Sequence, residues 1–553
     1  MRLRPIVSIL TASLIAGSLA MPAQSAGANN APQIPSITNM TYKPTPAIEA
    51  IPSTPDPAAV TKPNPTGDWN AYDLNVYETI MFPERQAGDT SADDAPGGAI
   101  AHGTCPIPTG CANHSLEFVK FWKQQMKKIV RPWGGAVHSY KFENVGSSVP
   151  PYVFASPSGK AFNLQAVIPG SVHPERMVIV SGHYDQTDSG PASAWDSAEG
   201  HATVFRIAKI MTDYWRKTGT RPAVSVKFTA WAGEESGTNG ARAFIRDNID
   251  PFPNLKVNAY FNLDPCAGAY PAFYRGNPAE QTPMVMQLGD PSQIVDPAQK
   301  KAMEDFNIQA RDIVGEVFNH LDDSITDVPT APEVFVSDEE AAESGVPSQE
   351  TKIVTAIGGL ALFSSDYARF EERGIPIFNL FPDVLGPHAD GSPAQADALA
   401  ILHTPNDNLL SLNAMTGVDQ SGLTPSEGWY KGLEMCAHMH AWFMLQPNMG
   451  GAVARTKEAV AYFEVLSPTP APLTAKKPLL FDAKGSHAFS GPATLKLVDP
   501  TKLKVSWNFG DGTKATGFPV KHAYAKKGAY TVTLTVKAPN GATDVMKMIV
   551  DVS

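Results

Sequence analysis

Several features that define common protein classes are scarce or missing in this sequence. Only four cysteines occur among 553 residues, and none shows the close CxxC spacing of a structural zinc site. Past the N-terminal region, no apolar run reaches the ~18 residues that a transmembrane helix needs. With 44 basic and 55 acidic residues the net charge is −11, which excludes a uniformly basic nucleic-acid-binding protein.

Motifs of several catalytic mechanisms are absent as well. The chain contains no Gly-x-Ser-x-Gly nucleophile elbow, no His-Glu-x-x-His segment and no glycine-rich phosphate-binding loop. Charged residues (18%) and hydrophobic residues (43%) occur in the proportions of a soluble globular protein, and the length predicts two or more folding units.

The N-terminal region is typical of exported proteins. Two arginines precede an apolar run from Ile6 to Ala20, and small residues follow, so residues 1–26 are predicted to be a secretory signal peptide. The alternative is a buried N-terminal helix. Residues 31–65 contain nine prolines and almost no apolar periodicity, so residues 27–70 are interpreted as a propeptide or an extended leader. We expect the protein to be secreted to the extracellular or periplasmic space.

The cysteines can form disulfides in an exported protein. Cys105 and Cys111 flank a Pro-Ile-Pro-Thr-Gly turn, which favours a local disulfide between them. No local pattern argues for or against a bond between Cys266 and Cys436, and that pairing stays open.

The chain from Met177 to Leu380 alternates short apolar runs with helical patterns. This alternation predicts an α/β fold with three α/β/α layers and a mostly parallel central sheet, within a domain at residues 71–465. Strands are expected at residues 177–182, 224–231, 259–263 and 375–381, and helices near residues 204–215 and 298–321. The second helix lies in an interrupting segment at residues 290–351, whose acidic loop near Asp338 is either a lid or a solvated insertion.

Residues of the kinds that bind metals follow the ends of these predicted strands. They are His183, Asp185, Asp196, Glu234, Glu235, Asp264 and, after a later apolar stretch, His403 and Asp407. Ligands bind outside the carboxyl ends of the strands in an open parallel sheet, so these side chains are expected to converge. Several buried carboxylates would be costly without compensation. Two divalent cations would remove that cost, and two histidines, three carboxylates and a water make a di-zinc site.

The adjacent pair Glu234-Glu235 suggests a division of roles. Neighbouring side chains in an extended segment point in opposite directions, so both are not expected to bind one metal. One can be a ligand while the other accepts a proton from the metal-activated water as the general base.

In this order the residues resemble those of the co-catalytic di-zinc exopeptidases of clan MH, peptidase family twenty-eight. That family includes secreted bacterial aminopeptidases and, more remotely, glutamate carboxypeptidases and glutaminyl cyclases. The resemblance covers residues 177–415 and includes Ser365-Asp366-Tyr-Ala-Arg-Phe370 followed by Gly374-Ile-Pro376. It implies the zinc exopeptidase fold, two Zn²⁺ per chain, and peptide or protein substrates.

The resemblance also implies a role for each site residue. The expected metal ligands are His183, Asp196, Glu235, Asp264 and His403. Asp196 would bridge the two ions, Glu234 would act as the general base, and Asp185 would orient His183. Asp407 is a further candidate for a residue that supports a ligand.

The sequence departs from the family pattern at three places. Leu402 precedes His403 where some members carry a tyrosine that stabilises the oxyanion. Trp195 replaces the usual small or polar residue before Asp196, and Pro265-Cys266 follows Asp264 where an apolar residue is commoner. The oxyanion donor and the substrate pocket therefore stay open.

The implied activity is that of an aminopeptidase, with two alternatives. A carboxypeptidase or a cyclase would use the same metal frame, and a carboxypeptidase would need arginine or lysine for the terminal carboxylate. Arg242, Arg275 and Arg369 are candidates for that contact. The other alternative is a non-catalytic extracellular binding protein.

Two other groups of residues were weighed as sites. One group, on a predicted helix, has the spacing of metal ligands and consists of Glu434, His438 and His440. The apolar residues between them favour a helix packed in the protein core over a metal site. His388 is a candidate for a residue that lines the cleft.

The last part of the chain, residues 466–553, differs in character from the rest. It carries 12 lysines and five aspartates, a net charge of +7. This region resembles a polycystic-kidney-disease (PKD) domain, an all-β immunoglobulin-like sandwich. The resemblance is carried by Trp507-Asn-Phe-Gly-Asp511-Gly and by the alternating strand Tyr530–Val536. Such a module is expected either to bind a protein, a polysaccharide or a cell surface, or to be only a spacer.

Overall fold

The computed structural model describes residues 112–143, 160–185, 194–235, 237–266, 284–325, 353–357, 365–382, 427–446, 449–454, 458–466, 472–491 and 496–553. The predicted signal peptide, the leader, the Cys105–Cys111 disulfide and the acidic loop near Asp338 lie outside the described residues. No helix within the described ranges is long and apolar enough to cross a membrane.

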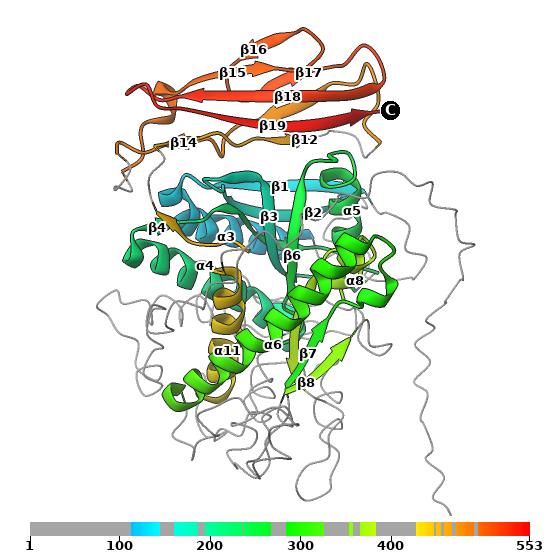
Figure 1. Ribbon diagram of the computed structural model, residues 1–553, viewed down its shortest axis with the longest axis vertical. Helices are drawn as coiled ribbons and strands as arrows, with labels where there is room; N and C mark the ends of the chain where they lie inside the picture. Colours follow the sequence, from blue (N-terminus) through cyan, green and yellow to red (C-terminus); the bar gives the residue numbers. More distant parts are fainter. Residues whose placement is uncertain are drawn as a thin grey trace, which may run out of the picture. The chain divides into compact units, whose positions relative to one another are not determined.

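One large sheet lies at the centre of the part of the chain that precedes the C-terminal strands (Figure 1). Its strand order is β1-β2-β5-β3-β6-β9-β7-β8. The bounds are β1 Ala136–Glu143, β2 Lys160–Ile168, β3 His173–His183, β5 Val224–Trp231, β6 Lys256–Asn262, β7 Met284–Leu288, β8 Ile353–Ile357 and β9 Ile377–Pro382. The four strands expected from the sequence are β3, β5, β6 and β9, and they form the middle of this sheet.

The sheet is mixed, with a parallel centre. Strands β3, β5, β6 and β9 run parallel to their neighbours within this block. At one side β2 is antiparallel to both β1 and β5, and at the other β7 is antiparallel to β9. The predicted parallel character therefore holds for the central strands, whose carboxyl ends meet at one edge.

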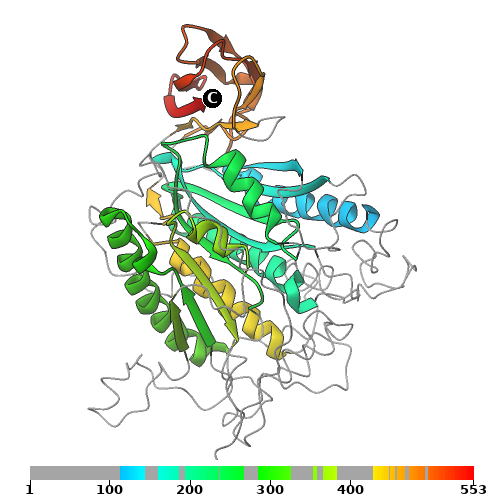
Figure 2. The ribbon, with the colours of Figure 1, turned by 90° about the vertical axis from the view of Figure 1, so that its right-hand side faces the viewer.

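Both faces of the sheet are covered, because alternate residues of each strand point to opposite sides. Val178 and Val180 of β3 pack with helices α3 (Ala112–Val130), α4 (Glu199–Thr218), α6 (Pro297–Ile325) and α11 (Glu427–Met444). Met177 and Ile179 pack with α5 (Asn239–Asn248) and α8 (Tyr367–Glu371) on the other side. Helices therefore lie on both sides of the sheet (Figure 2), which confirms the three-layer prediction.

Helix α4 shows why the sequence pattern was informative. Val204, Ile207 and Met211 recur at helical spacing, and all are fully buried against the sheet. The helix ends at Gly219, whose φ of 68° is a left-handed conformation that glycine adopts without steric cost. The predicted helix near residues 298–321 is likewise present, as α6.

The C-terminal region is a β-sandwich. Its strands are β11 Ala459–Val460, β12 Glu464–Leu466, β13 Leu479–Asp482, β14 His487–Ala488, β15 Lys504–Asn508, β16 Lys514–Thr516, β17 Val520–His522, β18 Gly528–Lys537 and β19 Thr543–Val552. Val532, Leu534 and Val536 of β18 are fully buried, as their alternation predicts. The buried Trp507 donates its indole N–H to the Gly517 carbonyl at 3.0 Å. Strand pairing in this region begins with Ala459, upstream of the boundary expected at residue 466.

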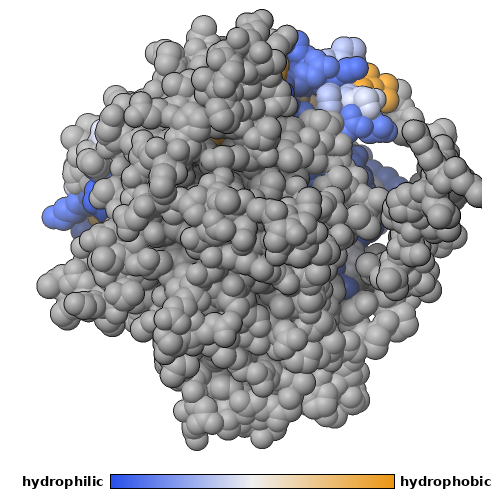
Figure 3. All heavy atoms as spheres, turned by 90° about the horizontal axis from the view of Figure 1, so that it is seen from below, coloured by the Kyte–Doolittle hydropathy of each residue, from blue (hydrophilic) through white to orange (hydrophobic). Residues whose placement is uncertain are grey.

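Large exposed hydrophobic side chains are few among the described residues. Val172, Val295, Ile308 and Val545 lie on separate segments of the chain. On the face seen in Figure 3, the described residues in view are largely hydrophilic.

A buried ion cluster joins the large sheet to the sandwich strand β12. The ammonium of Lys227 on β5 lies 2.6 Å from Oε1 of Glu464, and Nε2 of His138 lies 3.1 Å from Oε2. The phenol of Tyr462 donates to the same carboxylate at 3.0 Å. Burial alone would raise the pKa of Glu464, but Lys227 and His138 outweigh it and lower the pKa to about 2.

This cluster leads to a pH-dependent prediction for Glu464→Gln. Because the folded-state pKa lies below the ordinary value, charged Glu464 stabilises the fold above pH ~4.5, and this contribution is lost as the pH falls toward 2. We expect the variant to lose roughly 3 kcal/mol of unfolding free energy at pH 7, and about three quarters of this deficit to disappear by pH 2.5. Denaturant unfolding between pH 7 and 2.5 measures the difference, with Glu372→Gln, at an exposed ion pair, as the control. A deficit that does not change with pH would refute the assigned ion pairing.

Candidate metal centre

The residues with metal-binding side chains lie at the carboxyl edge of the parallel strands. His183 is the last residue of β3, Asp264 follows β6, and Glu234 and Glu235 follow β5. Asp196 lies in the short helical segment η4 (Ala194–Ala198), which leads into α4. Strand ends and a helix entry therefore supply all these side chains, as the sequence order suggested.

The imidazole of His183 stands at the centre of the group. Its Nε2 lies 2.9 Å from Oδ1 of Asp196 and 3.2 Å from Oδ1 of Asp264. Potential ligand atoms of His183, Asp196 and Glu235 all lie within 4.8 Å of one another, and the same holds for His183, Glu234 and Asp264. Each set has the dimensions of a site for one metal ion, and the two sets share His183.

Some of the expected site residues cannot be placed. The predicted fifth ligand, His403, lies outside the described residues. The same is true of Asp407 and His388. The structure thus brings together His183, Asp196, Glu235, Asp264 and the predicted base Glu234.

Asp185 has two roles in this arrangement. Nδ1 of His183 lies 3.1 Å from the carbonyl oxygen of Asp185 and 3.6 Å from its Oδ1, so the side of the ring that faces away from the ligands is held here. The Asp185 carboxylate also accepts the backbone N–H groups of Glu234 and Glu235, each at 3.1 Å. Asp185 therefore fixes the turn that carries both glutamates, a role that the sequence did not reveal.

Ser365 is a site residue whose role the sequence analysis missed. Its hydroxyl donates to Oδ2 of Asp264 at 2.7 Å and accepts from the side-chain amide of Asn262 at 3.2 Å. Oδ2 of Asp264 is therefore hydrogen-bonded to Ser365, while Oδ1 faces His183. The only signal for it in the sequence is the Ser365-Asp366 pair ahead of Gly374-Ile-Pro376, in the segment that resembles the family.

The electrostatics of the group reflect an excess of buried negative charge. Burial raises the pKa of Glu234 well above its usual value; His183 opposes this shift, and Asp264, Asp366 and Glu235 reinforce it. Burial likewise raises the pKa of Asp264, with His183 opposing. For His183 burial acts to lower the pKa, but Asp264 and the hydrogen-bonded carboxylates outweigh it, so the pKa is raised well above normal.

These shifts fit a site built for cations. Carboxylates that crowd together in a buried position are stabilised by positive charge, and among the described residues the imidazole beside them is that of His183. One imidazole nitrogen with carboxylate oxygens is a donor set that suits zinc. His183, Asp196, Glu235 and Asp264 are thus able to hold divalent metal, which a histidine binds in its deprotonated form.

The histidines of α11 are packed residues. His438 and His440 are 1% and 0% exposed, and Nδ1 of His440 lies 2.7 Å from the Cys436 carbonyl oxygen. Burial lowers the pKa of His440 to about 4. Both candidate metal groups among the described residues contain His183, so the packed-helix interpretation is the one that agrees with the structure.

Two segments of the chain match known protein families. Residues 163–315 match peptidase family M28, and residues 469–552 match the PKD domain. The first match contains the metal-binding side chains of the candidate centre, and the second contains most of the β-sandwich. The chain therefore carries a peptidase family M28 domain and a PKD domain, which confirms both resemblances seen in the sequence.

Curated relatives resemble the chain over a short region. A "Probable zinc metalloprotease" of Pyrenophora teres f. teres is 34% identical over 108 residues, which cover 18% of this chain and 21% of that protein. "Aminopeptidase NAALADL1" of Mus musculus is 31% identical over 102 residues (18% and 13%). "Carboxypeptidase Q" of Xenopus laevis is 35% identical over 113 residues (19% and 23%). The match spans at most about a quarter of the length of these relatives.

Two solved structures of aminopeptidases resemble the chain at low sequence identity. The aminopeptidase from Aneurinibacillus sp. strain AM-1 covers 74% of this chain and 99% of its own, at 12% identity and a TM-score of 0.36. The similarity to the LapA aminopeptidase of Legionella pneumophila covers 73% of this chain and 75% of that chain, at 14% identity and a TM-score of 0.37.

Proposed function

We propose that this protein is a secreted zinc exopeptidase that removes N-terminal residues from peptides. The observation that carries the proposal is the convergence of His183, Asp196, Glu234, Glu235 and Asp264 at the carboxyl edge of the parallel strands, inside a peptidase family M28 domain. His403 is proposed as the fifth ligand, and Asp196 as the carboxylate that two zinc ions would share.

The chemistry assigns distinct tasks to the residues of the site. Zinc, when bound, would polarise the scissile carbonyl and lower the pKa of a water molecule toward ~7. Glu234 then accepts the proton of the attacking water and donates it to the leaving amine. Asp185 keeps Glu234 in place through the backbone N–H that it binds, and Ser365 keeps the Asp264 carboxylate oriented.

Secretion is supported by the disulfide and by the PKD domain. Cys266 and Cys436 are bonded to each other, and disulfides persist mainly in oxidising compartments. Together with the basic, apolar N-terminal segment, this bond favours an extracellular or periplasmic location for the chain.

The choice between amino- and carboxypeptidase rests on how the substrate terminus is bound. A carboxypeptidase needs a cationic side chain for the terminal carboxylate. Arg369 already pairs with Glu372, and Arg242 donates to the Gly237 carbonyl at 3.0 Å. Each contact uses only one nitrogen of the guanidinium, so the aminopeptidase is proposed from the sequence resemblance; Arg275 lies outside the described residues.

A substrate panel tests this assignment. Leucine p-nitroanilide and a C-amidated peptide with a free N-terminus should be hydrolysed. Acetylation of the same N-terminus should lower kcat/KM at least ~100-fold, because the polar groups of a subsite that binds the free amine are then left without a hydrogen-bonding partner. Steady-state kinetics on matched free, N-acetylated and C-amidated peptides measures both effects.

The other readings give different outcomes in the same panel. Cleavage of the N-acetylated peptide together with loss of activity on the C-amidated one would identify a carboxypeptidase. Release of ammonia from an N-terminal glutamine peptide would identify a cyclase. No turnover of any substrate by the zinc-loaded protein would support a binding protein.

The PKD domain presents a basic face that supports a binding role. Lys504 on β15 and Lys537 on β18 are exposed and directly opposite in register, and like charges in this position are destabilising unless an anion compensates them. Lys514 and Lys547 are exposed on the neighbouring strands β16 and β19. We assign this face to an anionic polysaccharide. Equal retention of wild type and Lys504→Glu/Lys537→Glu on immobilised polygalacturonate at low salt would rule this out.

A further inference from the structure

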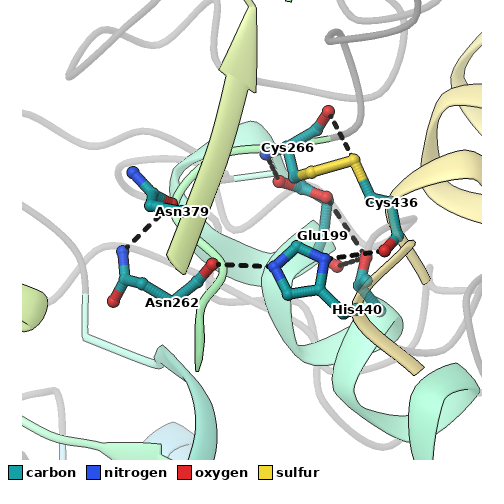
Figure 4. Close-up of a disulfide and its surroundings, with 7 residues drawn as sticks. Glu199, Asn262, Cys266, Asn379, Cys436 and His440 are labelled. Atoms are coloured by element: carbon teal, nitrogen blue, oxygen red, sulfur yellow. Dashed lines mark hydrogen bonds between the residues drawn. A yellow bond between two sulfur atoms is a disulfide. The ribbon is translucent and has the colours of Figure 1, made fainter. Parts of the chain in front are cut away.

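The segment that carries Asp264 is held by a distant helix. Cys266 lies two residues after Asp264 and is disulfide-bonded to Cys436 on α11, at a sequence separation of 170 residues. Sγ of Cys436 also lies 3.2 Å from the carbonyl oxygen of Cys266 (Figure 4). Both cysteines are fully buried. This explains the departure from the family pattern at Pro265-Cys266, since Cys266 is a covalent anchor here.

His440 forms a second link between the same two segments. Its Nε2 lies 3.3 Å from the carbonyl oxygen of Asn262 at the end of β6, and its Nδ1 lies 2.7 Å from the Cys436 carbonyl oxygen (Figure 4). His440 is one helical turn after Cys436. A neutral imidazole carries one N–H, so the tautomer with the proton on Nε2 makes this link: it donates to the Asn262 carbonyl and connects α11 to the residue at which the Asp264 segment leaves the sheet.

Helix α4 holds the segment from another side. The buried Glu199 carboxylate accepts the backbone N–H of Cys266, and the hydroxyl of Ser197 donates to the Leu263 carbonyl at 3.0 Å. Glu199 and Ser197 follow Asp196 in sequence, so the chain that carries Asp196 is tied to the chain that carries Asp264.

The contact between these segments leaves no space for adjustment. A Cβ atom at Gly200 would lie 2.4 Å from the Leu263 carbonyl oxygen, which is closer than real Cβ contacts. Backbone therefore packs directly on backbone beside the ligand. Residues 262–266 are therefore confined where they face the start of α4.

We propose that Cys266, Cys436 and His440 are positioning residues that set the affinity of the zinc ion bound by Asp264. We call these three residues the α11 brace. The inference rests on the proposed zinc site and adds to it a dependence on a disulfide that is remote in sequence. Opening the disulfide frees the Asp264 segment to move, so an oxidising environment would be needed for full metal loading.

The expected size of the effect follows from other outer contacts of metal ligands. Loss of a residue that orients a ligand typically weakens metal binding 10–100-fold. The brace acts on the backbone of the Asp264 segment, whereas His183 and Glu235 are held by Asp185. The affinity for the zinc ion that Asp264 binds should therefore fall, and the affinity for the second zinc ion should stay the same.

Competitive zinc titration with a chromophoric chelator tests the proposal. Wild type should show two binding steps, and Cys266→Ala/Cys436→Ala should show one step unchanged and one weakened 10–100-fold. His440→Leu should weaken the same step, and His440→Gln, which keeps a side-chain nitrogen that can donate, should restore much of it. Val550→Ala, in the core of the sandwich, is the control for general destabilisation and should bind zinc as wild type does.

Each result has a distinct consequence. If the cysteine variant unfolds at a lower temperature but titrates like wild type, the cysteines are structural only and the proposal is wrong. If the double variant does not fold, the two His440 variants decide, and equal zinc affinities in both would overturn it. If wild type binds no zinc, the proposed function fails instead, whatever the variants do.

Discussion

Replacing Glu234 with glutamine should leave zinc bound and lower kcat for peptide hydrolysis at least ~100-fold, the scale of a lost general base. Glutamine preserves the shape of the side chain, and the Glu234 N–H bond to Asp185 does not involve the side chain. The amide cannot accept the proton of the attacking water. The change should therefore fall on kcat, while KM stays within about threefold.

Two measurements on the purified variant check this result. Zinc content by mass spectrometry should equal that of wild type, and kinetics on leucine p-nitroanilide should show the loss. Glu372→Gln, an exposed glutamate of the neighbouring α8 region, is the matched control and should behave as wild type. A Glu234→Gln enzyme with near-normal kcat would remove Glu234 from the role of general base.

Replacing Asp196 with alanine should have the larger effect. Asp196 contacts His183 at 2.9 Å, and in the proposal its carboxylate bridges the two ions, so both sites lose a ligand at once. We expect less than one zinc per chain and a fall in kcat/KM on the order of 10³ or more, since metal supplies several kcal/mol of transition-state stabilisation.

Asp213→Ala provides the matched comparison, because Asp213 lies on the same α4 helix but pairs with Lys209 and Arg216 away from the site. It should retain zinc and activity. If Asp196→Ala kept two zinc ions with the affinity of wild type, the bridging role of Asp196 would be wrong, although His183 and Glu235 would remain candidate ligands.

The central fold was predictable because its signals are local. Apolar runs such as Val224–Trp231 lie fully buried in the middle of the sheet, and such runs are typical of parallel strands covered on both faces. The positions of His183, Glu234, Glu235 and Asp264 followed from a general rule about strand ends. The local alternation of β18 likewise predicted which side chains fill the sandwich core.

Contacts between distant segments could not be predicted. The bond between Cys266 and Cys436 joins residues 170 positions apart, and only the packing of α11 on the sheet brings them together. The same holds for Ser365, whose hydroxyl meets Asp264 from 101 residues away. The antiparallel pairing of β7 with β9 also had no local signal, since strand direction depends on the connections between strands.

The zinc content of the purified protein at neutral pH tests the central claim most directly. Two zinc ions per chain are expected if Asp196 is shared between two ions, as proposed. Fewer than one zinc per chain, measured by mass spectrometry after gel filtration in zinc-free buffer, would contradict the account of this site as a di-zinc exopeptidase centre.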